Sequence, residues 1–294
     1  MKKFGIGIIG LGYWGKKYFE TLCQISECDL YLCDVDDNAL RSINFKRYVD
    51  YEMILRNPDI NAVIIATPDS THYQLSRQAL LNGKDVLVEK PMSLTLRHAE
   101  ELVNLAQKMN RILAVAHTPL FSAGYRQLKN KLQSGKLSPV IQLEAIRTSR
   151  GRVKASNPLW DLASHDIAIG ISLFGKPKKT ICKINTPQTC QYEILFNNGM
   201  TFIGEAQWSE PPYLRRLRLI TKNCSYEYDE PIGVAKCDGP PPLTLMIHEF
   251  INCCTLRREP INNGNLGKQV VQCLENLTEY KIMNYEIVGN HTCL

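Results

Sequence analysis

A glycine-rich turn near the start of the chain has the spacing of a dinucleotide-binding loop. Residues 10–15 read Gly-Leu-Gly-Tyr-Trp-Gly, directly after the strand-like residues 4–9 and at the start of a helical pattern. The first glycine of such a turn permits the sharp bend, the second lets backbone amides approach a pyrophosphate, and the third allows close helix-to-strand packing. The sequence therefore predicts that Gly10, Gly12 and Gly15 hold a dinucleotide. A glycine-rich turn without a ligand is the minor alternative.

Asp34 is placed to recognise the ribose of such a cofactor. It ends the second strand-like segment, about 20 residues beyond Gly15, where a carboxylate can accept hydrogen bonds from both ribose hydroxyls. A 2′-phosphate would meet this carboxylate as a like charge. The next residues, Val35, Asp36 and Asp37, offer no Arg or Lys in compensation. The sequence favours NAD over NADP.

The elements around this turn follow the pattern of a doubly wound parallel sheet. Apolar runs that predict buried strands cover residues 4–9, 30–33, 62–66, 85–89 and 112–117. Amphipathic stretches between them predict helices at residues 13–23, 71–82 and 94–109, with Gly83 as a helix C-terminal cap. We therefore predict an α/β protein whose residues 1–118 form a Rossmann dinucleotide-binding domain.

The pattern changes after residue 118. Helices are predicted at residues 125–133, 160–174, 243–257 and 266–276, and strands at residues 140–148, 191–196, 200–207, 214–220 and 225–228. Asn197-Asn198-Gly199 tolerates positive φ, so the strands on either side of it are expected to pair as a hairpin. Residues 119–294 are therefore predicted to form an α+β domain for substrate binding and oligomerisation, with an open, mostly antiparallel sheet.

Composition argues against several classes of protein. The 294 residues are 44% hydrophobic, which suits two domains of ordinary size. No apolar run is long enough to span a membrane, and Met1-Lys2-Lys3 leads directly into the first strand without a signal-peptide pattern. The eleven cysteines include no C-x-x-C pair, so we expect free thiols and no metal site. These features predict a cytoplasmic protein without a membrane partner.

The net charge of +6 suits an anionic small ligand better than nucleic acid, because the basic residues are spread along the chain without a long Lys/Arg block. Two basic clusters occur, namely Arg147, Arg150 and Arg152, and Arg215, Arg216 and Arg218. A solvated strand or loop face is the favoured interpretation of each cluster. A phosphate contact is the alternative.

Several segments together resemble the Gfo/Idh/MocA oxidoreductases, the glucose-fructose oxidoreductase and inositol dehydrogenase family. They are the glycine-rich turn, Ala-Thr-Pro-Asp-Ser-Thr-His at 66–72, Glu-Lys-Pro at 89–91, Ala-His-Thr-Pro-Leu-Phe at 116–121 and Leu-Trp-Asp-Leu-Ala-Ser-His-Asp at 159–166. The resemblance spans nearly the whole chain. It implies a Rossmann domain joined to an open-faced sheet domain, in agreement with the element order.

The resemblance implies a catalytic set made of Lys90, Asp161 and His165. In the family, the Lys of the E-K-P motif is an acid/base, joined by an Asp and a His four residues apart on a helix. Positions i and i+4 share a helical face, so both side chains can point into one cleft. Such groups can remove the hydroxyl proton as hydride leaves an alcohol. The structural alternatives are a surface lysine, an acid complementing a helix dipole and a satisfied core histidine.

The resemblance also assigns binding residues. Cofactor contacts are predicted for Tyr13, Trp14, Thr67, Pro68, His72, Glu89, Lys90 and Trp160, besides the glycines and Asp34. Substrate contacts are predicted for Lys90, His117, Arg147, Asp161 and His165. The Lys90–Pro91 peptide bond is cis in relatives. For Trp160, plain packing is the alternative.

Residues 147–167 look more like the nucleotide-sugar branch of the family than the inositol branch. This implies an NAD-dependent dehydrogenase of a ring secondary alcohol, at C3, of a nucleotide-linked sugar such as a UDP-N-acetylhexosamine. Ser164 replaces a proline of many relatives and Leu120 an arginine of several, and both departures bear on the substrate.

Two other functions remain open: a dehydrogenase of a free sugar or inositol, and a non-catalytic NAD-binding regulator. The intact set of Lys90, Asp161 and His165 argues against the regulator, because a sensor has no need of an acid/base set. A homo-oligomer, a dimer or tetramer formed through the C-terminal sheet, is expected.

Overall fold

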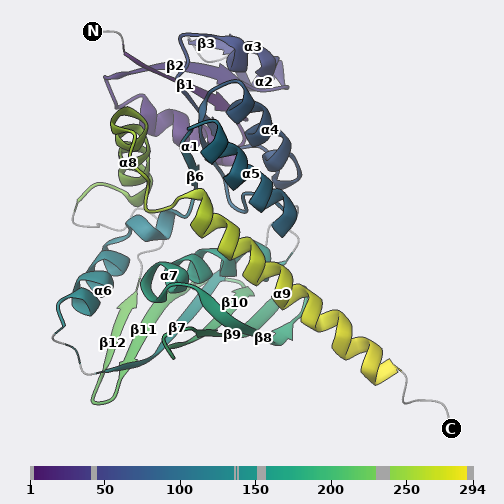
Figure 1. The fold of residues 1–294 in the computed structure, drawn as a ribbon, viewed down its shortest axis with the longest axis vertical. Helices are drawn as coiled ribbons and strands as arrows, with labels where there is room; N and C mark the ends of the chain where they lie inside the picture. Colours follow the sequence, from purple (N-terminus) through teal and green to yellow (C-terminus); the bar gives the residue numbers. More distant parts are fainter. Residues whose placement is uncertain are drawn as a thin grey trace. The chain divides into compact units, whose positions relative to one another are not determined.

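The chain folds into two units, each built on a six-stranded sheet (Figure 1). The computed structural model describes residues 3–40, 45–135, 137, 139–150, 157–229 and 239–289. The first unit combines Met1–His117 with Leu243–Lys268, and the second combines Thr118–Pro242 with Gln269–Leu294. Together the two sheets confirm the predicted fold class.

The sheet of the first unit is parallel, with strand order β3-β2-β1-β4-β5-β6. Its strands are β1 (Phe4–Ile9), β2 (Cys28–Cys33), β3 (Lys46–Tyr48), β4 (Ala62–Ile65), β5 (Asp85–Val88) and β6 (Leu113–Val115). This is the order of a Rossmann fold, in which the chain reverses direction across the sheet next to β1. The short β3 was not predicted, because Lys46-Arg47-Tyr48 contains no apolar run.

The helices that join these strands are α1 (Tyr13–Leu22), α2 (Asp37–Leu40), α3 (Tyr51–Arg56), α4 (Asp69–Leu81) and α5 (Leu96–Lys108). Helix α8 (Pro242–Leu256) comes much later in the chain and belongs almost entirely to the same unit. Helix α5 shows why such segments are helical: the Thr95 hydroxyl caps its first turn by accepting from the His98 amide at 3.3 Å. Its buried residues then recur at helical spacing, Ala99, Leu102, Val103 and Ala106. Gly83 has φ +72° after α4, as expected of a cap.

Residues 243–268 belong to the first unit, whereas the sequence prediction placed them in the second domain. The reason lies at β6, the edge strand of the sheet. The Val115 amide donates to the Asn262 carbonyl at 2.8 Å, and the Asn262 side-chain amide donates to the Val115 carbonyl at 2.7 Å. Arg257 also donates to the Asp85 carboxylate at 2.7 Å. A buried strand edge needs such partners, and no local sequence signal identifies them.

The sheet of the second unit has the order β12-β11-β7-β10-β9-β8. Its strands are β7 (Val140–Ser149), β8 (Pro177–Asn185), β9 (Thr189–Phe196), β10 (Thr201–Trp208), β11 (Arg215–Thr221) and β12 (Ser225–Asp229). Among the described strand pairs of this second sheet, only β7–β10 is parallel, so the sheet is mostly antiparallel as predicted. The predicted hairpin joins β9 to β10, with Gly199 at φ +83°. The lysine-rich β8 was not predicted.

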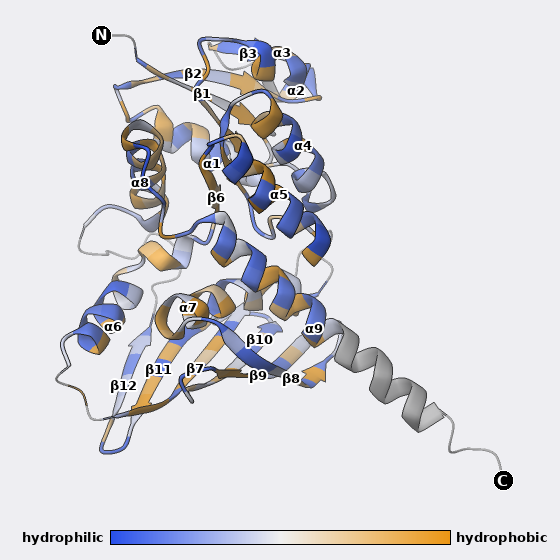
Figure 2. Ribbon diagram, in the orientation of Figure 1, coloured by the Kyte–Doolittle hydropathy of each residue, from blue (hydrophilic) through white to orange (hydrophobic). Residues whose placement is uncertain are grey.

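The helical segments of the second unit are η1 (Thr118–Phe121), α6 (Ala123–Gln133), η2 (Leu159–Ala163), α7 (Ser164–Phe174) and most of α9 (Gly264–Gly289). Helix α7 packs on one face of the sheet, where a Cβ on Gly170 would lie 3.2 Å from Phe202 and 3.3 Å from Phe196. The hydrophobic residues of α7 and β11 are orange in Figure 2. Among the described helices, none is long and apolar enough to cross a membrane.

Candidate active site

The three glycines of the glycine-rich turn differ in what an added side chain would meet. Gly10 adopts φ +93°, and a Cβ on Gly15 would lie 1.8 Å from the Gly10 carbonyl oxygen, so the backbone itself requires both glycines. Around Gly12, by contrast, no described atom lies within 4 Å of an added Cβ. Gly12 is the N-cap of α1 and makes no side-chain capping bond in the described structure. The turn therefore leaves open space at a helix N-terminus, which fits a pyrophosphate.

Asp34 fixes this turn to the end of β2. Its Oδ2 accepts from the Leu11 amide at 2.6 Å, and its Oδ1 accepts from the Asp36 amide at 2.9 Å. Each carboxylate oxygen can accept a further hydrogen bond, so the observed contacts are compatible with the predicted ribose contacts. Tyr13, which is 67% exposed, and Trp14 lie edge to face beside the turn, with ring centroids 5.6 Å apart.

The loop after β4 and the first turn of α4 carry three predicted cofactor residues, Thr67, Pro68 and His72. Pro68 is the N-cap of α4, and the Thr67 hydroxyl lies 2.6 Å from the Thr71 hydroxyl. His72 is only 2% exposed. Its Nδ1 lies 2.7 Å from the Pro91 carbonyl oxygen and its Nε2 lies 2.8 Å from the Thr67 carbonyl oxygen. His72 thus joins two loops of the site through their backbones.

Glu89 is buried beneath the segment that carries Lys90. The Tyr18 hydroxyl of α1 donates to Glu89 Oε1 at 2.7 Å, and the Lys90 amide donates to Oε2 at 3.2 Å. Burial raises the pKa of Glu89, while the Tyr18 hydrogen bond and the charges of Lys90 and His72 lower it. Within the described residues each carboxylate oxygen of Glu89 accepts one hydrogen bond from the protein, and its predicted contact with the cofactor stays a prediction. The Lys90–Pro91 bond is cis, as predicted.

His117 lies at the end of the segment that follows β6 and is 1% exposed. Burial, aided by the charge of Lys90, lowers the pKa of His117 to about 3. The imidazole is therefore neutral in any ordinary buffer. His117 is thus a buried side chain within electrostatic reach of Lys90, and its predicted contact with the substrate stays a prediction.

In the second unit, Asp161 and His165 follow one another along one helical segment. Asp161, 9% exposed, lies in the π-helical turn η2, where its amide donates to the Asn157 carbonyl at 3.0 Å. His165 is the second residue of α7. The sequence predicted a helix here, but not the π-turn, a feature that recurs at functional sites.

Arg147 contradicts the favoured interpretation of the first basic cluster as a solvated face. It is 4% exposed on β7, and its guanidinium donates to Asp166 with Nε at 2.9 Å from Oδ2 and Nη2 at 2.6 Å from Oδ1. Because Asp166 follows His165, this ion pair anchors the start of α7 to the sheet. Arg150 is exposed, and Arg152 lies outside the described residues. The sequence analysis missed Asp166.

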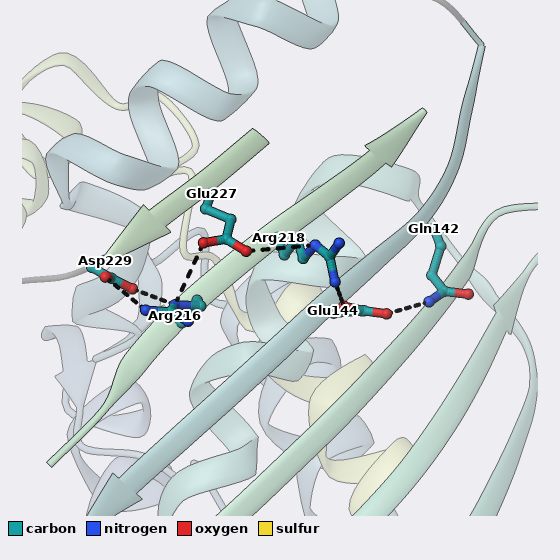
Figure 3. A network of polar contacts seen from close by, with 6 residues as sticks. All are labelled: Gln142, Glu144, Arg216, Arg218, Glu227 and Asp229. Atoms are coloured by element: carbon teal, nitrogen blue, oxygen red, sulfur yellow. Dashed lines mark hydrogen bonds and ion pairs between the residues drawn. The ribbon is translucent and has the colours of Figure 1, made fainter. Parts of the chain in front are cut away.

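Two members of the second basic cluster, Arg216 and Arg218, agree with the solvated-face interpretation, whereas Arg215 is half-buried on the inward face of β11 (Arg215–Thr221). Figure 3 shows Arg216 and Arg218 of β11 within a ladder of polar contacts on the sheet surface. Arg216 pairs with Asp229 at 2.8 Å, and Arg218 pairs with Glu144 at 3.4 Å and with Glu227 at 3.6 Å. The carboxylates of neighbouring strands therefore engage both guanidinium groups.

Trp160 was predicted to contact the cofactor, with plain packing as the alternative. Its indole N–H donates to the Thr278 hydroxyl of α9 at 3.2 Å, and that hydroxyl donates to the Leu274 carbonyl at 2.7 Å. This contact favours packing, because the polar end of the indole already has a partner within the second unit.

The glycine geometry predicts opposite results for two similar substitutions. Gly15→Ala forces a Cβ against the Gly10 carbonyl and should destabilise the first unit by several kcal/mol. Gly12→Ala meets open space in the protein and should fold normally, but it should weaken NADH binding by ~10-fold or more, because it fills the approach to the helix N-terminus. Thermal unfolding and NADH fluorescence titration of both variants measure this. If the two variants had the same unfolding temperature and the same NADH affinity, the proposed place of the pyrophosphate at Gly12 would be refuted.

Comparison with known proteins gives a consistent picture. Residues 4–117 match the model of the oxidoreductase family with an NAD-binding Rossmann fold, GFO_IDH_MocA. The chain is 30% identical to the uncharacterized oxidoreductase YdgJ of Escherichia coli K12, over 58% of this chain and 54% of that protein. It is 27% identical to the UDP-N-acetylglucosamine 3-dehydrogenase of Acidithiobacillus ferrooxidans, over 90% of this chain and 93% of that protein.

A solved structure, myo-inositol 2-dehydrogenase from Lactobacillus plantarum, matches with a TM-score of 0.85 at 17% identity, covering 96% of this chain and 98% of that chain. At this identity the match shows the fold alone. Four curated relatives of 30% to 35% identity, YdgJ among them, are matched over only 42% to 54% of their own length.

Proposed function

We propose that this chain, whose residues 4–117 match the Gfo/Idh/MocA model, is a member of that oxidoreductase family and an NAD-dependent dehydrogenase acting on a ring secondary alcohol of a sugar. The observation that carries the proposal is the open turn at Gly12, at the N-terminus of α1 and beside Asp34. When bound there, the nicotinamide cofactor would supply the acceptor for the hydride that leaves the alcohol carbon.

The cofactor is proposed to be NAD, because Asp34 would repel a 2′-phosphate. NADH should bind more tightly than NADPH by at least ~1 to 2 kcal/mol, the order expected for an uncompensated like charge in a partly desolvated site. Asp34→Ala should narrow this gap in a fluorescence titration. Asp36→Ala is the matched control, since that side chain bonds only to Asn38 in the described structure, and it should preserve the gap. Equal affinities in the unmutated protein would defeat the preference.

The protein groups divide the proton chemistry. Lys90 is proposed to take the hydroxyl proton on its Nζ, His165 to hold or relay that proton, and Asp161 to orient the sugar and the imidazole. Arg147 supports this work indirectly, because its ion pair with Asp166 holds the start of the helix that carries His165. Because the buried His117 has a pKa of about 3, it neither gains nor loses a proton near neutral pH.

The substrate is proposed to be a nucleotide-linked sugar oxidised at C3, such as a UDP-N-acetylhexosamine. Two features support this: the net charge of +6, and the relative from Acidithiobacillus ferrooxidans that is matched over most of its length. An anionic diphosphate would supply binding energy remote from the reacting carbon, which can orient that carbon. The resemblance to inositol dehydrogenases keeps free sugars and inositol as the second candidates.

A substrate panel tests this proposal. UDP-N-acetylglucosamine and other UDP-sugars should form NADH at concentrations at which N-acetylglucosamine, glucose and myo-inositol form little. A coupled aminotransferase would remove the keto product, since such equilibria favour the alcohol. If myo-inositol or glucose turns over better than every UDP-sugar, the second candidate replaces the first. Tight NAD binding without any turnover would favour the regulator.

We also propose a cytoplasmic homo-oligomer, a dimer or tetramer, that associates through the sheet of the second unit. The support comes from the sheet face opposite α7, where Ile203 of β10 is 41% exposed and Ile184 of β8 is 40% exposed. Exposed apolar side chains on an uncovered sheet face are a common feature of subunit interfaces. The reducing compartment is supported by the free thiols of the described cysteines.

A further inference from the structure

We infer that His72 is a positioning residue for Lys90 and that it acts as a doubly protonated imidazole, donating one hydrogen bond to each of two loops. The role in positioning rests on the proposed function of Lys90 as the acid/base. The protonation state of His72 does not depend on that proposed function, because it is inferred from the hydrogen bonds alone.

The hydrogen bonds require two donors on one ring. Nδ1 lies 2.7 Å from the Pro91 carbonyl oxygen and Nε2 lies 2.8 Å from the Thr67 carbonyl oxygen, both within hydrogen-bonding distance. A carbonyl oxygen can only accept, and a neutral imidazole carries a single N–H. A neutral His72 would therefore direct a lone pair at one carbonyl inside a site that is 2% exposed. The imidazolium satisfies both acceptors, with charge-assisted bonds.

The charge of this imidazolium acts on Glu89, a buried acid of the same unit. The Glu89 carboxylate is held in place by the Tyr18 hydroxyl and the Lys90 amide. Burial raises the pKa of Glu89 overall, and the Tyr18 hydrogen bond and the positive charges of Lys90 and His72 partly offset this rise, so the carboxyl group lies within electrostatic reach of both side chains. Charge-assisted hydrogen bonds to two carbonyl oxygens offset the cost of burying the imidazolium.

Together these contacts fix the backbone on both sides of Lys90. On one side, Glu89 is tied by Tyr18 to α1, the helix that starts at the glycine-rich turn. On the other side, Pro91 is tied by His72 to the Thr67 loop. Both anchoring elements belong to the proposed cofactor site. The four-carbon stem of lysine is flexible, so a fixed backbone limits where its ammonium can lie.

The protonation state is tested on the full-length, unmutated protein without any sugar. Histidine labelled with ¹⁵N is followed at neutral pH, and His72 is assigned as the signal lost in His72→Gln. We expect both ring nitrogens of His72 to carry protons, with and without NADH. A spectrum in which one His72 nitrogen is unprotonated would overturn the doubly protonated ring.

The positioning role is tested by kinetics. A glutamine side chain can donate to only one of the two carbonyls, so His72→Gln should lower kcat by roughly 10- to 100-fold, the scale of a misplaced catalytic group. NADH affinity should change little, whereas the unfolding temperature should fall, because glutamine leaves one buried carbonyl without its donor. His98→Gln is the matched control, because His98 stacks on Tyr73 with ring centroids 3.8 Å apart, and it should leave kcat unchanged.

A folded His72→Gln protein with normal kcat would overturn the positioning role. If His72→Gln does not fold, Tyr18→Phe tests the other anchor: it keeps the aromatic ring, removes the hydrogen bond to Glu89, and should lower kcat without weakening NADH binding. Normal kcat in that variant would count against the inference equally. Absence of turnover in the unmutated protein with every sugar would refute the proposed function instead, and the ¹⁵N spectrum would still decide the state of His72.

Discussion

Replacing Lys90 with alanine should lower kcat roughly 100-fold or more, the usual scale for losing a positioned acid/base. The loss should fall on kcat, because Lys90 is proposed to act on the hydroxyl proton rather than to bind the cofactor. NADH affinity, measured by fluorescence titration, should therefore stay close to that of the unmutated protein. Steady-state rates on the best sugar of the panel give the comparison.

The control for this substitution is Lys108→Ala, which removes an exposed ammonium from the last turn of α5 and should leave kcat unchanged. A Lys90→Ala enzyme with near-normal turnover would refute the assignment of Lys90 as the acid/base.

The pH profile of the oxidative reaction is a second measurement on the same site. Because burial lowers the pKa of His117 to about 3, His117 does not titrate near neutrality. If the oxidative rate rises as the pH increases through neutrality, the group that loses its proton is therefore not His117.

Replacing Arg147 with methionine should lower the free energy of unfolding of the second unit by about 3 to 5 kcal/mol, since it leaves the Asp166 carboxylate buried without its ion-pair partner. The side chains of this pair are only 5% and 3% exposed. The double variant Arg147→Met/Asp166→Leu should recover much of the loss, because removing both charges also removes the desolvation cost. Urea unfolding followed by tryptophan fluorescence, with Trp160 and Trp208 in this unit, measures both variants.

Arg216→Met is the matched control, because its ion pair with Asp229 lies on the surface, with side chains 36% and 60% exposed. Such pairs contribute about 0 to 1 kcal/mol, so this variant should unfold almost like the unmutated protein. If Arg147→Met were as stable as Arg216→Met, the buried pair would not hold α7 to the sheet. The proposal that this ion pair helps to position His165 would then be refuted as well.

The parts of the fold that the sequence predicts well are those with a local cause. Continuous apolar runs mark the buried strands of the parallel sheet, and the glycine-rich turn is identified by its spacing and its position after β1. The hairpin at Asn197-Asn198-Gly199 follows from residues that tolerate positive φ. In each case the residues that cause the structure lie within the structure they form.

The features that the sequence analysis missed depend on distant partners. Residues 243–268 join the first unit because Asn262 pairs with Val115, and the sequence separation of 147 residues hides this. The hydrogen bonds that join His72 to Pro91 and Tyr18 to Glu89 are further examples, and the contacts of His72 and Glu89 with the cofactor stay predictions. The burial of Arg147 did have a signal: it follows Leu143 and Ala145 in the alternation of β7, on the inward face. A charged residue at an inward position calls for a buried partner.

Transfer of a deuterium label tests the central claim most directly. UDP-N-acetylglucosamine deuterated at C3 is incubated with the protein and NAD, and the reduced cofactor is analysed by mass spectrometry. Hydride transfer from C3 predicts one deuterium in the nicotinamide ring of the NADH formed, and much less NADH from the Lys90→Ala protein. NADH without deuterium would contradict oxidation at C3, and no NADH from any sugar of the panel would contradict the dehydrogenase itself.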